Sequence, residues 1–177
     1  MKSKRKVILY IASSVDGFIA KKNGDIDWLS VVERPGEDYG YESFINTVDT
    51  VIMGRKTYDK VLSFGIEFPH KNKDCYVISR TKTGNDENVT FFGGDVSNLI
   101  QELKNKEGKN IFIDGGSEVV RELKSRNLID EYVISYIPIM LGNGISLFQE
   151  TKIDTKLELV DSKTFESGLV QVIYRTV

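Results

Sequence analysis

Short apolar runs alternate with amphipathic stretches over most of the chain. Runs dense in Val, Ile, Phe and Tyr are typical of strands buried on both faces of a sheet, and they occupy residues 6–13, 50–53, 74–79 and 110–114. Helices are predicted between these runs, at residues 38–48, at residues 55–62, after Asp95 and after Ser117. This alternation predicts an α/β protein with a largely parallel sheet.

The best-defined helix is predicted by apolar residues that recur with the α-helical period. A stripe with the spacing i, i+3, i+4 and i+7 is formed by Val96, Leu99, Ile100 and Leu103. Asp95 directly precedes this stripe, where Asp is a favoured N-cap.

The C-terminal third has a different pattern, with strands at residues 131–137, 157–164 and 169–175 and no helix between them. The turn signal Glu166-Ser167-Gly168 joins the last two strands into an antiparallel hairpin. Residues 1–177 therefore form a single α/β domain with a mixed, mainly parallel sheet and an antiparallel C-terminal hairpin. Two strands with exposed edges, 131–137 and 169–175, favour a homodimer that would cover them.

Composition narrows the classes of function. The chain has 177 residues, 28% of them charged, and a formal net charge of −2, so it has no general attraction for nucleic acid or an anionic membrane. A single cysteine, Cys75, excludes an intrachain disulfide, and a single histidine, His70, excludes a His-rich metal site.

The N-terminus carries Lys2, Lys4, Arg5 and Lys6 before the first apolar run. That run is short for an export signal and far too short to span a bilayer. The segment is interpreted as a basic tail followed by a buried strand, and a cytoplasmic location is expected.

Two glycine turns each join the end of a predicted strand to the start of a predicted helix. The strand at 50–53 ends at Gly54, and Arg55-Lys56-Thr57 opens a helix; the strand at 110–114 ends at Gly115-Gly116, and Ser117-Glu118 opens the next. A helix N-terminus suits an anion, and glycine lets the backbone approach a phosphate. Each glycine alone can equally serve only the tight turn. Two such turns, one followed by Arg-Lys-Thr, favour a dinucleotide with several phosphates.

A third element, Ser79-Arg80-Thr81, follows the strand at 74–79. An arginine at a strand end is usually a solvated charge. Beside Arg55, however, Arg80 can pair with the 2′-phosphate that distinguishes NADPH from NADH, and Ser79 can add a hydroxyl donor.

These motifs carry a specific resemblance. Residues 51–58, 76–80 and 111–119 resemble, in order, the three cofactor signatures of dihydrofolate reductases. Residues 14–20, 27–29, 128–131, 138–144 and 147–148 are similar to one branch of that superfamily, the reductase domain of riboflavin biosynthesis and its stand-alone relatives. The resemblance covers nearly the whole chain and implies the three-layer αβα dihydrofolate-reductase-like fold.

The resemblance implies NADPH as cofactor, a heterocyclic small-molecule substrate, and a homodimer. It places Ala12 and Ile19 beside the nicotinamide, with a mobile loop that closes over the cofactor. The residues it assigns to the rest of the cofactor are Gly54, Arg55, Lys56, Thr57, Ser79, Arg80, Gly115, Gly116, Ser117, Glu118 and Val119.

Hydride transfer to a C=N or C=O bond requires a proton or a stabilising charge. In dihydrofolate reductases an acidic residue on the helix before the first signature assists, and the position that corresponds to it is Asp38. The alternative is that Asp38 caps the helix at 38–48. Asp16 and Asp27 are weaker rivals, and Asp16 is better explained as organising the turn at Gly17.

Two further residues bear on the substrate. Trp28 is interpreted as a wall of the substrate pocket or, alternatively, as a core anchor. Glu42 stands where folate-reducing members carry an apolar residue, which counts against folate.

The sequence therefore predicts an NADPH-dependent reductase that acts on a pteridine- or pyrimidine-like heterocycle. The zinc deaminase domain of bifunctional riboflavin enzymes needs a His/Cys/Cys ligand set, which one His and one Cys cannot supply. The alternative is an NADPH-binding module without catalysis, because function depends on the site and not on the fold.

Overall fold

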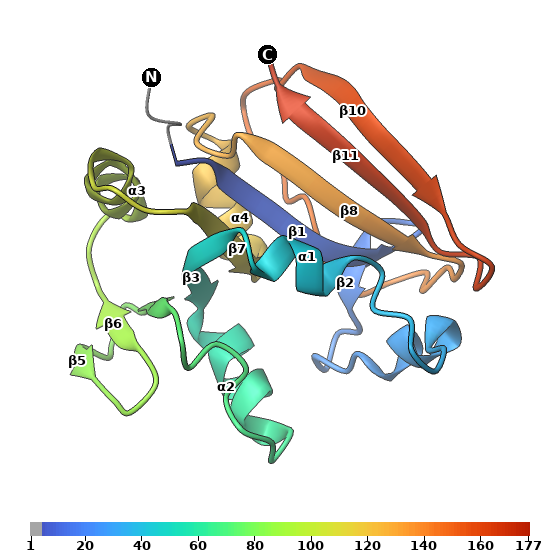
Figure 1. Ribbon diagram of the computed structural model, residues 1–177, viewed down its shortest axis with the longest axis horizontal. Helices are drawn as coiled ribbons and strands as arrows, with labels where there is room; N and C mark the ends of the chain where they lie inside the picture. Colours follow the sequence, from blue (N-terminus) through green and yellow to red (C-terminus); the bar gives the residue numbers. More distant parts are fainter. Residues whose placement is uncertain (1–4) are drawn as a thin grey trace.

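The computed structural model describes residues 5–177 (Figure 1). The strands of the main sheet are β1 (Val7–Ser14), β3 (Val48–Gly54), β4 (Asp74–Ile78), β5 (Gly84–Asn85), β6 (Thr90–Phe92), β7 (Asn110–Gly115), β8 (Glu131–Ile137), β10 (Leu157–Thr164) and β11 (Val170–Thr176). A small second sheet is formed by β2 (Phe18–Ala20) and β9 (Ile145–Ser146). The helices are the 3₁₀ helix η1 (Asp27–Val32), α1 (Tyr41–Ile45), α2 (Arg55–Ser63), α3 (Val96–Asn105) and α4 (Ser117–Lys124).

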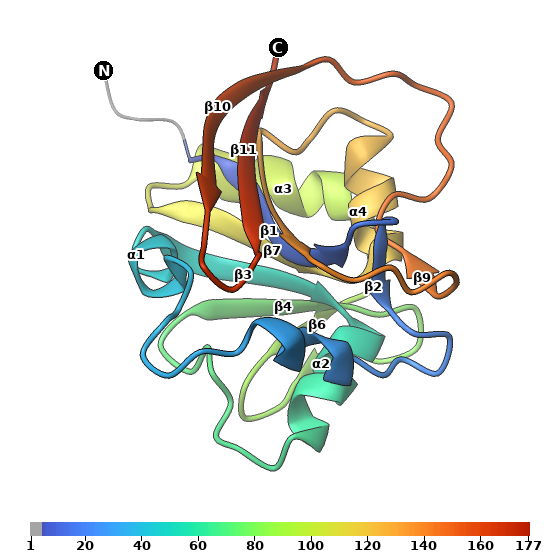
Figure 2. The same cartoon turned by 90° about the vertical axis from the view of Figure 1, so that its right-hand side faces the viewer.

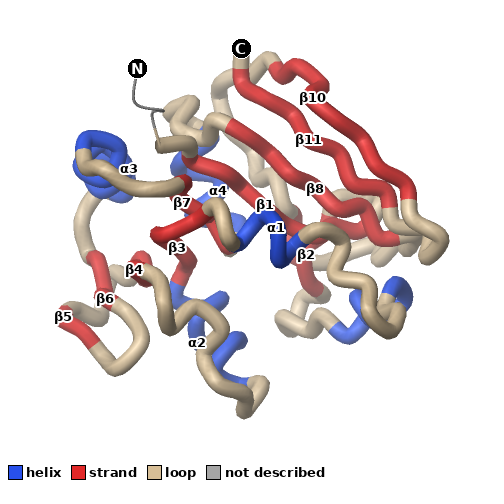
Figure 3. The backbone as a smooth tube through the Cα atoms, in the orientation of Figure 1, coloured by secondary structure: helices blue, strands red, loops and turns tan. Residues whose placement is uncertain are grey.

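The nine-stranded sheet has the order β10-β11-β8-β1-β7-β3-β4-β6-β5. From β8 to β6 the neighbours run parallel, whereas β11, β10 and β5 pair antiparallel. Figure 3 shows β8, β11 and β10 side by side, with the predicted hairpin at the edge of the sheet. The predicted fold class is confirmed.

The two faces of the sheet bury different cores. Helices α3 and α4 cover one face, where Ile100 and Leu123 are fully buried against Leu9 and Ile113. On the opposite face α1 and α2 cover a second core that includes Tyr58 and Phe112. Figure 2 shows α3 and α4 on the other side of the strands from α1. The parallel strands are buried on both sides, which explains their continuous apolar runs.

Helix α3 begins as the sequence predicts. The Asp95 side chain accepts a hydrogen bond from the Ser97 backbone amide at 2.8 Å. Arg126 donates to both carboxylate oxygens of Asp95, at 2.6 and 2.7 Å. The bonds from Arg126 and from Ser97 lower the pKa of Asp95 to about 2.

The helix predicted at residues 38–48 is shorter than expected, because α1 covers only Tyr41–Ile45. Tyr39 and Gly40 have positive φ angles of 57° and 83°, a left-handed conformation that cannot continue an α-helix. The helix ends where the chain turns into β3 at Val48. Only the middle of the predicted segment is therefore helical.

The predicted basic tail is wrong at Arg5, which is only 6% exposed. Its guanidinium pairs with Asp49 and donates to Thr50 Oγ1 at 2.7 Å and to two backbone carbonyls, of Leu103 and Lys109. Arg5 therefore ties β1 to its neighbours, because a buried charge must be paired. Lys2 and Lys4 lie outside the described residues.

The edge strand β10 is exposed along its whole length. It bears the exposed apolar residues Leu157, Leu159 and Val160. The prediction of exposed edges at residues 131–137 and 169–175 is wrong, because β8 and β11 are each paired on both sides and β10 forms the edge. The homodimer remains a prediction, with β10 as the edge that a partner would cover. Within residues 5–177, no helix is long and apolar enough to cross a membrane, and no cluster of three or more His, Cys, Asp or Glu side chains could hold a metal ion.

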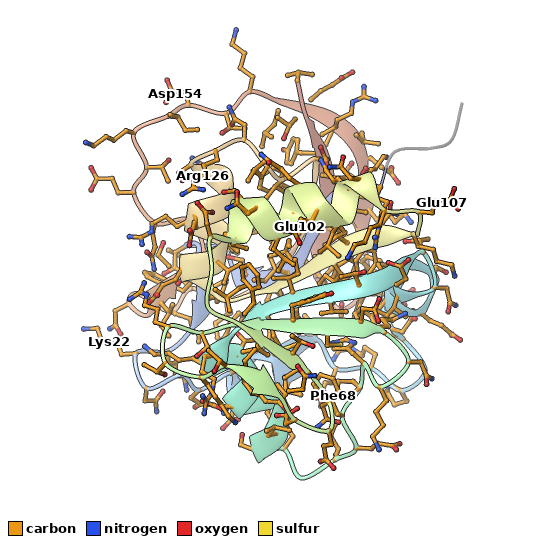
Figure 4. All side chains as sticks on the ribbon, turned by 90° about the vertical axis from the view of Figure 1, so that its left-hand side faces the viewer. Lys22, Phe68, Glu102, Glu107, Arg126 and Asp154 are labelled. Carbon is orange, nitrogen blue, oxygen red and sulfur yellow. The ribbon has the colours of Figure 1, made fainter. Side chains whose placement is uncertain are left out.

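The core between the sheet and helices α3 and α4, which we call the back core, should contribute most to the free energy of unfolding. Ile100→Ala on α3 removes a fully buried side chain, and we expect a loss of about 2–5 kcal/mol in the free energy of unfolding, measured by urea denaturation. Glu102→Ala, on the exposed side of the same helix (Figure 4), is the control and should change stability by less than about 0.5 kcal/mol. Equal losses would contradict the assignment of α3 to this core.

Candidate functional site

The two glycine turns lie against each other in the structure. β3 and β7 are parallel neighbours, with Met53 opposite Gly115. A Cβ atom at Gly54 would lie 3.4 Å from the Gly116 backbone nitrogen, and a Cβ at Gly116 would lie 3.2 Å from Thr57 Oγ1. The glycines therefore keep side chains out of the point where the two turns meet, and a ligand can approach both backbones closely there.

Each turn leads directly into a helix. α2 begins at Arg55 and α4 at Ser117, and neither helix has a side-chain hydrogen bond at its N-cap. The first amides and the positive dipole ends of both helices are thus available at one edge of the sheet, which suits an anionic group. Gln149 also reaches this edge, where its Nε2 donates to Ser117 Oγ at 2.9 Å.

Cations surround the turns. Arg80 is 86% exposed, and its Nη2 lies 3.4 Å from Glu118 Oε2 at the start of α4. Arg55 pairs with Asp59, one turn further along α2, at 2.8 Å. The structure thus links the third predicted element to the second glycine turn through Arg80 and Glu118.

Lys82 is a further cation that the sequence does not single out. Its Nζ lies 4.2 Å from the centre of the Phe91 ring, and Arg55 Cζ lies 5.7 Å from the same centre. Two positive side chains therefore share one aromatic ring, with Arg55 from α2 and Lys82 from the turn after β4. The only sequence signal was the place of Lys82, directly after Ser79-Arg80-Thr81.

The other predicted cofactor residues differ in how exposed they are. Ser79 is buried, and its Oγ accepts hydrogen bonds from the amides of Thr81 and Lys82, so it shapes the turn after β4. Val119 is buried in the back core. Lys56 is exposed on α2. Their contacts with a cofactor stay predictions.

The two predicted nicotinamide neighbours lie on touching strands, since β1 contacts β2. Ala12, in β1, is partly buried beside the cluster that contains Trp28. Ile19, in β2, is partly buried against the back core. The loop between them is held by Asp16, which accepts hydrogen bonds from Ser14 Oγ and from the amides of Leu141 and Gly142.

Those hydrogen bonds, the one from Ser14 first, lower the pKa of Asp16. These hydrogen bonds agree with the interpretation of Asp16 as a residue that organises the turn at Gly17. Asp27, the other weak rival, is exposed at the start of η1.

An aromatic face covers β1 and β7 beneath α1. The Tyr10 ring stacks on Phe44 with centroids 4.4 Å apart and meets the edge of Tyr41 at 5.7 Å. Phe44 packs edge-on against Phe112 at 5.1 Å. Buried Gln171 donates to the Tyr10 hydroxyl at 3.2 Å, which ties this face to β11.

Asp38 lies two residues before Gly40, which is the N-cap of α1, so it is not the N-cap residue that the alternative names. It is exposed, and its carboxylate accepts from the amides of Glu42 at 2.8 Å and Gly40 at 2.9 Å. These bonds, the one from Glu42 first, hold the pKa of Asp38 below its usual 3.8. Asp38 nevertheless borders the aromatic face: burial raises the pKa of Tyr10, and the Asp38 charge adds to that effect.

The two predicted substrate residues differ in accessibility. Trp28 is 5% exposed and packs with Val32, Ile137 and Leu169, as the core-anchor alternative states. Among the described residues, its indole Nε1 has no hydrogen-bond partner. Glu42 is exposed on α1.

Asp114 is a carboxylate that the sequence analysis did not assign. It follows the apolar residues 111–113 and directly precedes Gly115-Gly116, with its side chain 25% exposed. It lies at an irregularity in the pairing of β7 with β3, and its side chain lies on the face of Phe112, because His70, which packs against Phe112, is 3.6 Å from it. Burial raises the pKa of Tyr41, and the charge of Asp114 contributes after it. The overlooked signal was a single charge closing an apolar run before two glycines.

A hollow of about 300 Å³ lies at the opposite, amino end of the strands, between Lys104, Asp130 and Arg175. Its charges are largely paired: Lys104 with Asp130, Lys6 with Glu131, and Arg175 with Glu158. Open α/β sheets bind ligands at the carboxyl ends of strands, so we assign the site to the glycine turns.

A mainly parallel sheet with facing glycine turns at the ends of β3 and β7, and with carboxylates beside an aromatic face, defines a dihydrofolate-reductase-like domain of reductase type. The profile of the RibD C-terminal domain family matches residues 5–171, and the chain belongs to this family. The predicted resemblance is confirmed.

Relatives agree with this assignment. The uncharacterized protein YwjB of Bacillus subtilis (strain 168) is 45% identical over 171 residues, which cover 96% of this chain and 97% of YwjB. A crystal structure of a Shewanella sp. PV-4 protein named for riboflavin biosynthesis superposes with a TM-score of 0.90 at 34% identity, covering 97% of this chain and 99% of that one.

A more distant structure shares the fold alone. It is a Thermotoga maritima diaminohydroxyphosphoribosylaminopyrimidine deaminase/5-amino-6-(5-phosphoribosylamino)uracil reductase, with a TM-score of 0.72 and 18% identity over 98% of this chain and 57% of that one.

The hydrogen bonds to Asp38 predict a pH dependence of stability. Because the folded-state pKa of Asp38 is lowered, its stabilising contribution is present above its usual pKa of 3.8 and is lost as the pH falls through the lowered value. Asp38→Asn should therefore lose less melting temperature than the wild type between about pH 5 and pH 2, measured by thermal denaturation. Ser43→Ala, on α1, is the control. Identical slopes for the wild type and Asp38→Asn would refute a stabilising role of these hydrogen bonds.

Proposed function

We propose that the protein is an NADPH-dependent reductase that transfers a hydride to a pyrimidine- or pteridine-like heterocycle. The observation that carries the proposal is the meeting of the two glycine turns. A Cβ atom added at Gly54 would lie 3.4 Å from the Gly116 nitrogen, and one added at Gly116 would lie 3.2 Å from Thr57 Oγ1. Each turn opens a helix without a side-chain cap, so the pair forms a cradle for a diphosphate. When bound, the reduced nicotinamide supplies the hydride.

The cations support the choice of NADPH over NADH. A 2′-phosphate is a dianion that arginine and lysine recognise, and Arg55 and Lys82 share the Phe91 ring beside the first turn. Arg80 is held near the second turn by its ion pair with Glu118. We assign Arg55 and Lys82 to the 2′-phosphate, and Arg80 to the outer side of the same site.

The aromatic face supports the heterocycle. Tyr10 from β1 and Tyr41 from α1 supply flat, amphipathic rings, and two carboxylates border them: Asp38 from the loop before α1 and Asp114 from β7. A carboxyl group with a lowered pKa is ionised near neutral pH, so Asp38 is suited to accept an N–H of the ring and not to donate a proton. Asp114 is the second candidate to stabilise or protonate the reacting group.

The relatives favour a pyrimidine within this class. The Shewanella protein is named for riboflavin biosynthesis, and the name of the Thermotoga enzyme includes the reduction of 5-amino-6-(5-phosphoribosylamino)uracil. Exposed Glu42, at a position that is apolar in folate-reducing members, also counts against folate. A pyrimidine with a ribosyl or ribityl substituent is therefore the first substrate to test.

The cofactor assignment predicts a selective effect of Arg55→Ala. Loss of a charged partner of the 2′-phosphate should raise the dissociation constant of NADPH about ten- to hundredfold and leave NADH nearly unchanged, measured by fluorescence titration. Arg121→Ala, an exposed arginine on α4, is the control. Equal losses for both nucleotides would refute the role of Arg55, and no binding of either by the wild type would refute the proposed function.

The reductase assignment predicts that the protein oxidises NADPH rapidly with 5-amino-6-(5-phosphoribosylamino)uracil and only slowly with dihydrofolate.

Asp114→Asn should lower kcat by roughly 10²-fold while NADPH affinity is kept, because proton transfer or charge stabilisation is lost. Ser43→Ala on α1 is the control. Tight NADPH binding without turnover of any heterocycle would favour the non-catalytic module instead.

A further inference from the structure

His70 is the only histidine of the chain, and it is buried in the segment between α2 and β4. It is 3% exposed, with its ring packed edge-on against Phe68 at 5.6 Å and Phe112 at 6.0 Å. Figure 4 labels Phe68 in this segment. The His70 carbonyl accepts hydrogen bonds from Cys75 Sγ and from the Lys73 amide. The imidazole is therefore held in one place by both its backbone and its ring neighbours.

The two ring nitrogens have different surroundings. Nε2 lies 3.6 Å from Asp114 Oδ2, slightly beyond hydrogen-bond distance. Nδ1 is buried and has no hydrogen-bond partner among the described residues. A hydrogen on Nδ1 would be an unpaired buried donor, whereas a hydrogen on Nε2 points at a carboxylate. The surroundings thus favour a hydrogen on Nε2 over one on Nδ1.

Asp114 connects this buried ring to the candidate site. One of its oxygens faces His70, and the side chain is still 25% exposed, directly before the Gly115-Gly116 turn. The other titratable groups near the pair are Tyr41 from α1, whose pKa is affected by Asp114, and Cys75 from β4. Burial, and after it the charges of Asp74 and Asp114, raise the pKa of Cys75 to about 12, so the thiol is neutral near pH 7.

We propose that His70 is a positioning residue: its Nε2–H holds the Asp114 carboxylate toward the substrate side of the site. The proposal rests on the proposed function only for what Asp114 faces. Contacts of this kind are often long without ligand and tighten in the complex, so the pair shortens when the nucleotide binds. A ring that serves only to fill the space between Phe68 and Phe112 would have no preferred tautomer and no response to a ligand.

The single histidine makes the pair directly observable. Long-range ¹H–¹⁵N spectra of protein labelled with ¹⁵N-histidine report one imidazole, and at pH 7 we expect a protonated Nε2 and a bare Nδ1. Asp114→Ala should weaken this preference, because the acceptor is gone. Saturation with NADP⁺ should move the Nε2–H proton downfield. A protonated Nδ1, a spectrum unchanged by Asp114→Ala, or no response to bound NADP⁺ would each overturn the proposal.

Variants of His70 separate positioning from packing. His70→Gln keeps an amide N–H that can reach Asp114, whereas His70→Phe keeps the volume and ring and loses the donor. We expect His70→Phe to lower kcat about ten- to hundredfold with unchanged NADPH affinity, and His70→Gln to restore most of it. Lys71→Ala, at an exposed neighbour of His70 that pairs with Glu67, leaves the ring and Asp114 in place and should behave as the wild type. Equal activity of His70→Phe and wild type would overturn the proposal. Failure of the wild type to turn over a heterocycle would count against the proposed function, and the spectra would still decide on the pair.

Discussion

The structure depends on one constraint, the parallel register that brings the ends of β3 and β7 together. Met53 stands opposite Gly115, and this places Gly54 within a Cβ contact of the Gly116 amide. The pairing is irregular between Ile52 and Met53, where Asp114 is passed over, and this irregularity brings Met53 opposite Gly115. The approach of the two turns, and the joint use of two helix N-termini, follow from that register.

Both faces of the sheet carry an apolar core, and the carboxylates assigned to the site border the front one. Behind β1, β3 and β7, α3 and α4 bury a continuous apolar core. In front, the short helix α1 and the left-handed turn at Tyr39 and Gly40 leave room for a face that mixes aromatic rings with carboxylates. The left-handed turn at Tyr39 and Gly40 places Asp38 outside the helix, where its charge acts on Tyr10 at the border of this face.

Polar side chains from different elements meet at three places in the structure. Buried Arg5 joins β1 to Asp49 and Thr50, Asp95 joins α3 to Arg126, and His70 approaches Asp114. In each case the two partners are more than twenty residues apart in sequence. The first two pairs join segments that are distant in the chain, and the third, in which the atoms are 3.6 Å apart, ends at Asp114 in the candidate site.

The sequence by itself determined most of the secondary structure and the position of the glycine turns. Strands buried on both faces give unbroken apolar runs, the α3 stripe has helical period, and Gly54 and Gly115-Gly116 mark strand-to-helix turns; all of these are local signals. It did not determine that Arg5 is buried, that the helix near Asp38 is short, or that Asp114 and Lys82 belong to the site. Only the tertiary structure decided these, because partners distant in the chain determine whether a charge is paired, and because strand register and packing, not spacing along the chain, determine which side chains share a face.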